Sequence, residues 1–130
     1  MKIGLYSELA RPHIVMIREE IAAMEIGSSE DEIRKFRQSL VESPAVHHRV
    51  LTSSSDFFSL STLRDLIFHV QEHRFTLPQI QSCLDHLGLK FCGFESPDIV
   101  SKFKKSLGEG ADIYDLSLWH QFEQSYPRTF

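Results

Sequence analysis

The sequence has few cysteines and no long apolar run. Its 130 residues include only two cysteines, Cys83 and Cys92. Two cysteines are too few for the disulfide framework of a small secreted domain, so a reducing, cytoplasmic compartment is the simpler expectation. No apolar run approaches the roughly 20 residues that a membrane-spanning helix needs. The sequence therefore predicts no association with a membrane.

The sequence also lacks an excess of positive charge and a glycine-rich loop. Its 14 basic and 18 acidic residues leave a net charge of −4, which does not favour a nucleic-acid surface. Gly108-Glu109-Gly110 is the only G-x-G, and it follows a lysine-rich helix. Nucleotide-binding glycine loops instead follow a strand and open a helix. We therefore interpret these glycines as a connector and expect no cofactor to bind to this chain.

The remaining composition is that of an ordinary globular protein. Hydrophobic residues make up 42% of the chain and charged residues 25%, which is close to the average for folded domains. At this length, residues 1–130 form a single domain or a domain fragment.

The clearest local signals lie between residues 76 and 94. Thr76 and Gln79 have the spacing of a helix-capping box, and Pro78 lies in the first turn. Gly88 is placed to end this helix. Residues 89–94 are apolar and aromatic, and they predict a strand. One apolar helix face is predicted from residues at helical spacing: Ile80, Cys83, Leu84 and Leu87.

A second strand is predicted over residues 2–7, where Ile3 and Leu5 alternate with Gly4 and Tyr6. The fold class is thus α/β and helix-rich, with two short strands (about 2–7 and 89–94) and about six helices around one core. Gly27 is expected to end the first helix, which begins at Pro12, and Asp112 to cap the last. The expected core includes these residues of the other helices: Ile14, Ile17, Ile21, Met24, Ile33, Phe36, Leu40, Val41, Leu63, Leu66, Ile67, Phe103, Leu116, Trp119 and Phe122.

Histidines occur in two patterns that could bind metal. His69-Val-Gln-Glu-His73 matches H-x-x-E-H, in which two histidines on one helix face share a zinc ion. Because Thr76 begins a new helix three residues later, we prefer a structural or substrate-side polar cluster. His47 and His48 are adjacent, and adjacent residues on a helix point about 100° apart. We therefore interpret this pair as a solvated helix surface and predict no metal site.

Tyr6, Ser7 and Glu8 come where the first predicted strand ends. In open α/β sheets, ligands bind at the carboxyl ends of the strands. These three residues are therefore candidates for binding a substrate. The alternative is a strand-end turn that Ser7 caps.

Four segments resemble one class of bacterial S-adenosylmethionine-dependent methyltransferases, which is often fused to tetratricopeptide repeats. Residues 69–80 and 87–95 resemble the late part of that domain. Lys2–Arg11 resembles its fifth strand and the following turn, and Leu116–Phe130 resembles the segment that leads into its last strand. The resemblance implies a partial Rossmann-like methyltransferase fold.

In such an enzyme, Glu8 would orient or deprotonate the methyl acceptor and Tyr6 would stack on it. A second contribution to the acceptor side would come from four residues: His69, Glu72, His73 and Arg74. The family holds S-adenosylmethionine on a glycine-rich loop after its first strand, with an acidic residue after the second. Since this chain has neither, the cofactor is expected to bind to the full-length enzyme and not to this chain.

The expected partner is the remainder of the methyltransferase domain or another protein chain. A second copy could also pair through the strand edges, because exposed edges invite pairing. The acceptor is not indicated by any motif. The alternative function is a helical protein-interaction module without catalytic activity.

Overall fold

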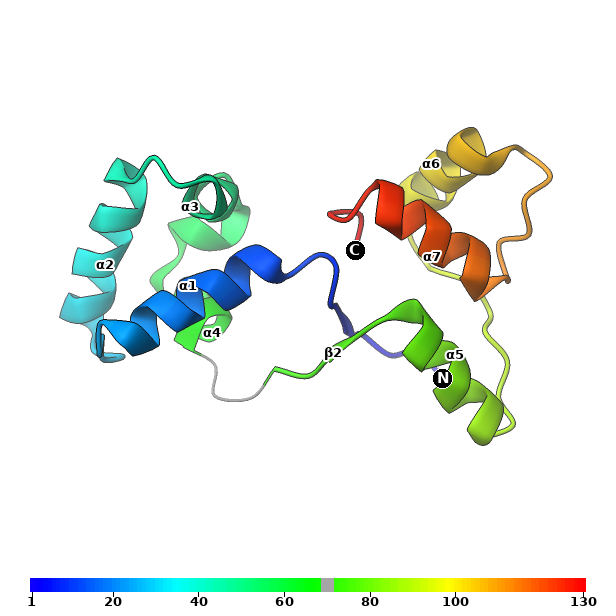
Figure 1. Cartoon of the computed structure of the whole chain (residues 1–130), viewed down its shortest axis with the longest axis horizontal. Helices are drawn as coiled ribbons and strands as arrows, with labels where there is room; N and C mark the ends of the chain where they lie inside the picture. The colour runs from blue at the N-terminus through cyan, green and yellow to red at the C-terminus, as the bar shows by residue number, and fades with distance from the viewer. Residues whose placement is uncertain (69–71) are drawn as a thin grey trace. The chain divides into compact units, whose positions relative to one another are not determined.

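The computed structural model describes residues 1–68 and 72–130, which form two compact units (Figure 1). Unit 1 contains Met1–Ala10 and His73–Phe130, and unit 2 contains Arg11–Glu72. The described residues form seven α-helices, one short 3-10 helix and two strands, so the helix-rich character is confirmed. No described helix combines the length and the apolar character that crossing a membrane requires.

Unit 2 is a helical bundle in which α1 packs against α3 and α4, and α2 also packs against both (Figure 1). Its elements are α1 (Pro12–Ala23), α2 (Glu30–Glu42), α3 (Val46–Thr52), η1 (Ser55–Phe58) and α4 (Leu60–Phe68). Its core contains ten buried residues: Ile14, Ile17, Ile21, Ile33, Phe36, Leu40, Leu51, Phe57, Leu63 and Ile67. Met24 and Val41 were expected in the core but are 60% and 59% exposed.

The first helix ends at Ala23, and Gly27 does not end it as predicted. Its end is a Schellman motif, in which Ile26 N–H donates to the Ile21 carbonyl and Glu25 N–H donates to the Ala22 carbonyl. The motif requires a left-handed residue, and Glu25 takes that position with φ 53°. Gly27 N–H instead donates to Glu32 Oε1, at 3.2 Å.

Unit 1 contains β1 (Tyr6–Ser7), β2 (Arg74–Phe75), α5 (Leu77–His86), α6 (Pro97–Leu107) and α7 (Leu116–Ser125). Helix α7 contacts both α5 and α6. The core of unit 1 is formed by Leu77, Phe103, Leu116, Trp119 and Phe122. The rings of Phe103 and Trp119 stack with centroids 3.9 Å apart. The buried side chains therefore form two clusters in place of the one core expected.

The capping box of α5 is confirmed, since Thr76 N–H donates to Gln79 Oε1 and Gln79 N–H donates to Thr76 Oγ1. The predicted apolar face of α5 is narrower than expected. Cys83 is exposed and Leu87 is 59% exposed, and only the other two predicted residues contact the core: Ile80 and Leu84. Helix α7 is capped by Asp115, whose carboxylate accepts from Ser117 N–H at 2.7 Å, and not by Asp112.

The second strand is β2, and the prediction of a strand at residues 89–94 is wrong. Strand β1 pairs with β2 in parallel, with Tyr6 opposite Arg74 and Ser7 opposite Phe75. Strand β1 covers only the end of the predicted range 2–7. Glu8 N–H extends the pairing by donating to the Phe75 carbonyl at 3.1 Å.

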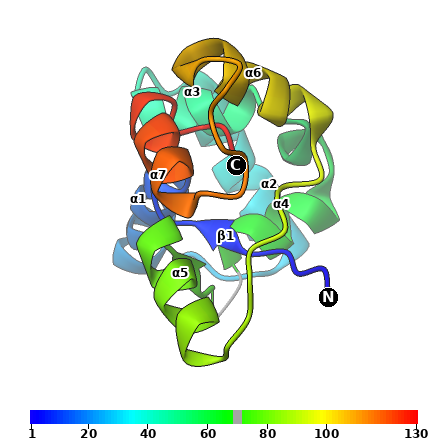
Figure 2. The same ribbon diagram turned by 90° about the vertical axis from the view of Figure 1, so that its right-hand side faces the viewer.

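Residues 89–94 are coil for local physical reasons (Figure 2). Leu89 N–H completes the cap of α5 by donating to the Leu84 carbonyl at 2.9 Å. Gly93 has φ 100°, which interrupts an extended backbone. Phe91 and Phe94 both pack against the core of unit 1, whereas residues three apart on a strand point to opposite faces. The aromatic content of this segment therefore reflects core packing by a loop.

The left-handed Glu25 offers a test of the end of α1. Glu25→Gly should raise the free energy of unfolding by about 0.5–1 kcal/mol, because glycine adopts positive φ without a steric penalty. Glu19→Gly is the matched control, since Glu19 is exposed within α1, and it should lower stability by about 1 kcal/mol. Urea unfolding of both variants checks the signs. Equal destabilisation by the two glycines would contradict the assigned Schellman motif.

Candidate functional site

The β1–β2 pair places several of the sequence-predicted residues together in unit 1. Tyr6 lies opposite Arg74 in the parallel register, and Glu8 follows β1 directly. His73 precedes β2 and is exposed. Residues far apart in the sequence that were assigned to the acceptor side therefore meet in one small sheet.

Ser7 makes the strand-end turn that was its alternative interpretation. Its Oγ accepts from Ala10 N–H at 3.2 Å and donates to Glu123 Oε1 of α7. Glu123 is only 1% exposed, and no hydrogen-bond partner is found for its Oε2 within the described residues. Sequence reasoning missed Glu123, because its position beside Phe122 on α7 carries no signal of its contact with β1.

Glu72 belongs to unit 2 and pairs with α1. Its Oε2 lies 3.1 Å from Arg18 Nη2, and the same nitrogen donates to the Leu66 carbonyl at 2.6 Å. Of the two histidines of the H-x-x-E-H pattern, His69 lies outside the described residues. The structure therefore gives Glu72 a partner within unit 2, and the zinc interpretation of this pattern stays a hypothesis.

Among the surface recesses of unit 1, two open ones have volumes of about 650 Å³ and 540 Å³. The first is bordered by three cationic side chains: Lys102, Lys105 and Arg128. Within the part of the chain that the structure describes, neither recess is lined by the predicted acceptor-side residues: Tyr6, Ser7, Glu8, His73 and Arg74. These residues therefore belong to the strand pair and not to either recess.

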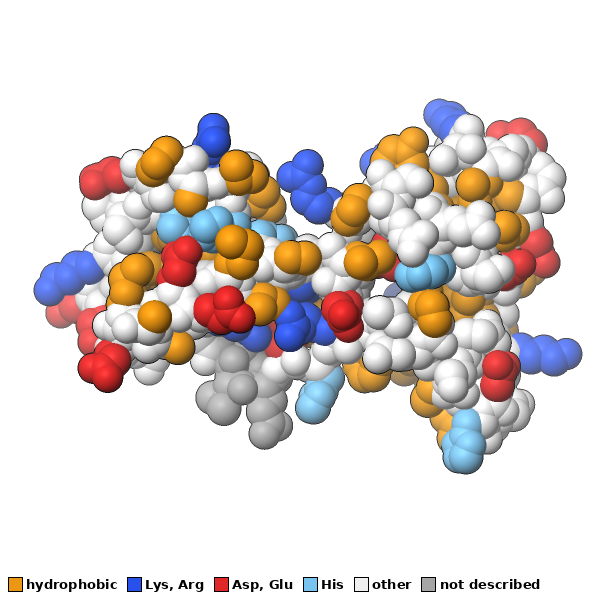
Figure 3. All heavy atoms as spheres, in the orientation of Figure 1, with side chains coloured by type: hydrophobic (Ala, Val, Ile, Leu, Met, Phe, Trp, Pro, Cys, Tyr) orange, Lys and Arg blue, Asp and Glu red, His pale blue; other side chains and the backbone are white. Residues whose placement is uncertain are grey.

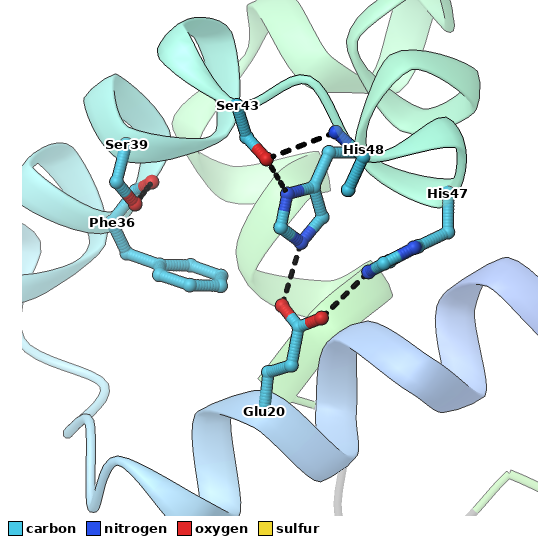
Figure 4. A network of polar contacts seen from close by, with 7 residues as sticks. Glu20, Phe36, Ser39, Ser43, His47 and His48 are labelled. Carbon is cyan, nitrogen blue, oxygen red and sulfur yellow. Dashed lines mark hydrogen bonds and ion pairs between the residues drawn. The ribbon is translucent and has the colours of Figure 1, made fainter.

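Unit 2 contains a cluster that the sequence did not indicate, formed by Glu20, His47 and His48 (Figure 4). His47 Nε2 lies 2.6 Å from Glu20 Oε1, and His48 Nε2 lies 2.6 Å from Glu20 Oε2. The two imidazole rings meet edge to face, with centroids 4.2 Å apart. The two oxygens of the Glu20 carboxylate therefore each contact a different imidazole ring.

The convergence of the two adjacent histidines follows from the packing of α1 on α3. Leu51 is the buried residue of α3. His47 and His48 precede it by four and three positions, which places them about 40° to one side and about 60° to the other of the buried direction. A carboxylate that approaches along this direction can reach both rings. The expectation of a solvated surface pair is therefore wrong.

Glu20 approaches along this direction because it borders the buried face of α1, three residues after Ile17. Its long side chain extends to α3, and Phe36 of α2 points toward the same group (Figure 4). The side chains of His47, His48 and Glu20 are 16%, 13% and 29% exposed. The cluster therefore lies between the core of unit 2 and solvent.

Ser43 supports the cluster from the α2–α3 connection. Pro44 disfavours a helical backbone at Ser43, which has extended dihedral angles. Its Oγ lies 2.7 Å from His48 Nδ1 and accepts from Ala45 N–H at 3.3 Å. This contact orients the ring and leaves His48 Nε2 directed at Glu20 (Figure 4).

The pKa of Glu20 reflects two opposing effects. Burial raises the pKa of Glu20, but hydrogen bonds from His47 and His48, together with their charges, lower it below the ordinary value of 4.5. Glu20 is therefore held as a carboxylate, which is the form that accepts hydrogen bonds or binds a cation.

Comparison of the chain with protein-family models, with curated proteins and with solved structures gives no match. The functional argument therefore depends on the residues and their geometry.

The lowered pKa of Glu20 predicts a pH-dependent contribution to stability. The contribution is complete above pH 4.5, the ordinary value, and is lost as pH falls through the lower pKa of the folded state. Glu20→Gln should therefore be less stable than wild type at about pH 6, and the two should converge toward about pH 3. Urea unfolding across this range measures the difference. Glu19→Gln is the control and should keep the wild-type profile, whereas parallel curves for Glu20→Gln would contradict the assigned pairing.

The hydrogen bond from Ser7 to the buried Glu123 predicts a large difference in stability between single and double variants. Ser7→Ala should cost about 1–3 kcal/mol, because it leaves a buried carboxylate oxygen without its donor. The double variant Ser7→Ala/Glu123→Leu should recover most of this loss, since both polar partners are removed. Thermal unfolding monitored by circular dichroism checks the cycle. Ser125→Ala, at an exposed position of α7, should change stability by less than about 0.5 kcal/mol.

Proposed function

We propose that this chain supplies the C-terminal, acceptor-side part of an S-adenosylmethionine-dependent methyltransferase, within a partial Rossmann-like fold. The proposal starts from the resemblance of the four segments described above. One structural observation supports it. Two of those segments contribute the parallel strand pair: Tyr6–Ser7 from the first stretch of the chain and Arg74–Phe75 from the later one.

Parallel pairing suits this proposal because parallel sheets occur mainly in α/β proteins, where helices cover both faces. Ligands in such sheets bind beyond the carboxyl ends of the strands. Glu8 comes directly after the carboxyl end of β1 and would orient or deprotonate the acceptor. Tyr6 would stack on the acceptor beside Arg74, with His73 adjacent in the chain. Ser7 has a structural role in this scheme, since it bonds Glu123 and Ala10.

The small size of the sheet indicates the kind of partner. A sheet of two short strands is marginal by itself. Ile3 and Leu5, which lead into β1, are 57% and 44% exposed. An exposed apolar segment in line with a strand is suited to pairing with a further strand. In this proposal that strand comes from the remainder of the methyltransferase domain, which also holds the cofactor.

The cofactor assignment gives a direct test. The 130-residue chain should show no heat of binding with S-adenosylhomocysteine at concentrations up to about 1 mM, because no glycine-rich loop follows either strand. Isothermal titration calorimetry measures this. A dissociation constant in the micromolar range would overturn the assignment of cofactor binding to residues outside this chain.

The coding DNA on both sides of these codons separates the proposal from its alternative. A glycine-rich nucleotide-binding motif encoded upstream, in the same reading frame or an adjacent one, is the expected finding. Its absence would favour a helical interaction module without chemistry of its own. Exposed apolar residues of unit 2, such as Phe58 at 70% and Val46 at 69%, are the observation that favours this alternative.

A further inference from the structure

We propose that Glu20, His47 and His48 form a binding site for one zinc ion within unit 2, where α1 faces α3. The proposal uses none of the residues assigned to the acceptor side, so the two can fail separately. It goes beyond the proposed function, because it gives unit 2 a ligand of its own.

The ligand atoms already converge on one point. One atom from each of the three side chains lies within 4.8 Å of the other two. Each histidine Nε2 is 2.6 Å from a carboxylate oxygen, which is a hydrogen-bond separation. Tetrahedral zinc with bonds of about 2.1 Å would place neighbouring ligand atoms about 3.4 Å apart. Each histidine nitrogen must therefore move about 0.8 Å away from its carboxylate oxygen, and the remaining pairs of ligand atoms, which lie within 4.8 Å, must adjust to the same spacing by rotation of the side chains.

The ligand chemistry favours zinc over magnesium or calcium. Two imidazoles and one carboxylate are a set that zinc uses in sites with three protein ligands. Magnesium and calcium prefer oxygen ligands throughout. Three protein ligands leave a fourth position, which water or an anion would occupy. With the dication, two neutral imidazoles and one carboxylate give a net charge of +1.

Ser43 is placed to select the tautomer of His48 that binds metal. If Ser43 Oγ accepts from His48 Nδ1–H, the lone pair of Nε2 faces Glu20. In the metal-free protein the 2.6 Å contact is instead a hydrogen bond from His48 Nε2–H to Glu20, so a zinc ion would take the place of that proton, which is released to solvent. Metal-bound histidines commonly donate their other ring N–H to such a partner, which orients the ring. Ser43 is a positioning residue and not a ligand.

The surroundings give the site both a rigid base and access to solvent. Leu51, on the same face of α3, is 1% exposed, and α1 packs directly on α3. Histidine side chains reach the surface of unit 2 between α1 and α3 in the space-filling view (Figure 3). An ion can therefore enter from solvent and meet ligands held by a packed interface. Since the ion would join two helices, its binding should stabilise the folded unit.

The experiment uses the full chain, freed of metal with a chelator and titrated with zinc sulfate in a competition assay. We expect one zinc ion per chain and a rise in the unfolding temperature on addition of zinc. Cobalt chloride should give the visible absorption of a tetrahedral site. Wild-type protein that shows neither stoichiometric zinc binding nor thermal stabilisation would overturn the proposal.

Variants assign the ligands. His47→Ala, His48→Ala and Glu20→Gln should each weaken zinc binding by more than about 100-fold, which exceeds the usual cost of losing an outer-shell partner. Ser43→Ala should weaken it by about 10-fold. His86→Ala is the matched control, since His86 lies on α5 of unit 1, and it should bind zinc as wild type does.

His73→Ala distinguishes this site from the H-x-x-E-H pattern and should also keep wild-type affinity. Zinc binding that is lost in His73→Ala but kept in Glu20→Gln would overturn the proposal and assign the ion to that pattern. Circular dichroism of each metal-free variant verifies folding. Glu20→Gln, which is nearly isosteric, carries the assignment if an alanine variant does not fold.

Discussion

The parallel pairing of β1 with β2 is the constraint on which the organisation of this chain depends. It joins residues 6–7 to residues 74–75, and so brings Met1–Ala10 into the same unit as His73–Phe130. The residues between these two segments, Arg11–Glu72, form a separate helical unit. Both ends of this unit continue along the chain into unit 1. The Ser7–Glu123 hydrogen bond then ties β1 to α7, so that the first residues of the chain become part of a unit built mainly from the last ones.

Each unit places a carboxylate beside its apolar core. In unit 1 this group is Glu123, which is buried beside Phe122. In unit 2 it is Glu20, which receives two imidazoles at the border of the core. Carboxylates at such positions require partners, because an unpaired buried charge costs several kcal/mol. The two groups differ in what they can do. Glu123 has one donor and little access to solvent, whereas Glu20 faces two imidazoles and is partly exposed to solvent.

Local features were predicted well wherever the determining atoms lie within a few residues. The capping box of Thr76 and Gln79 needs only helix geometry. The buried stripes of α1 and α2 follow from helical spacing. Errors arose where two local signals competed. Phe91 and Phe94 have strand-like composition, but Gly93 and the cap of α5 keep their segment as coil. Glu25, and not the nearby glycine, takes the left-handed position.

The sequence by itself determined the helices, most of their buried faces and the lack of a glycine-rich cradle for a nucleotide. These properties depend on spacing along the chain, which can be read directly. Only the tertiary structure decided that Tyr6 lies opposite Arg74, that Ser7 bonds Glu123 and that Glu20 joins His47 to His48. These partners are far apart in sequence, and periodicity carries no information about which helix or strand will face another. The adjacent histidines are an example. Their angular separation on α3 indicated that they would not face a common partner, but Glu20 of α1 lies between them and contacts both rings.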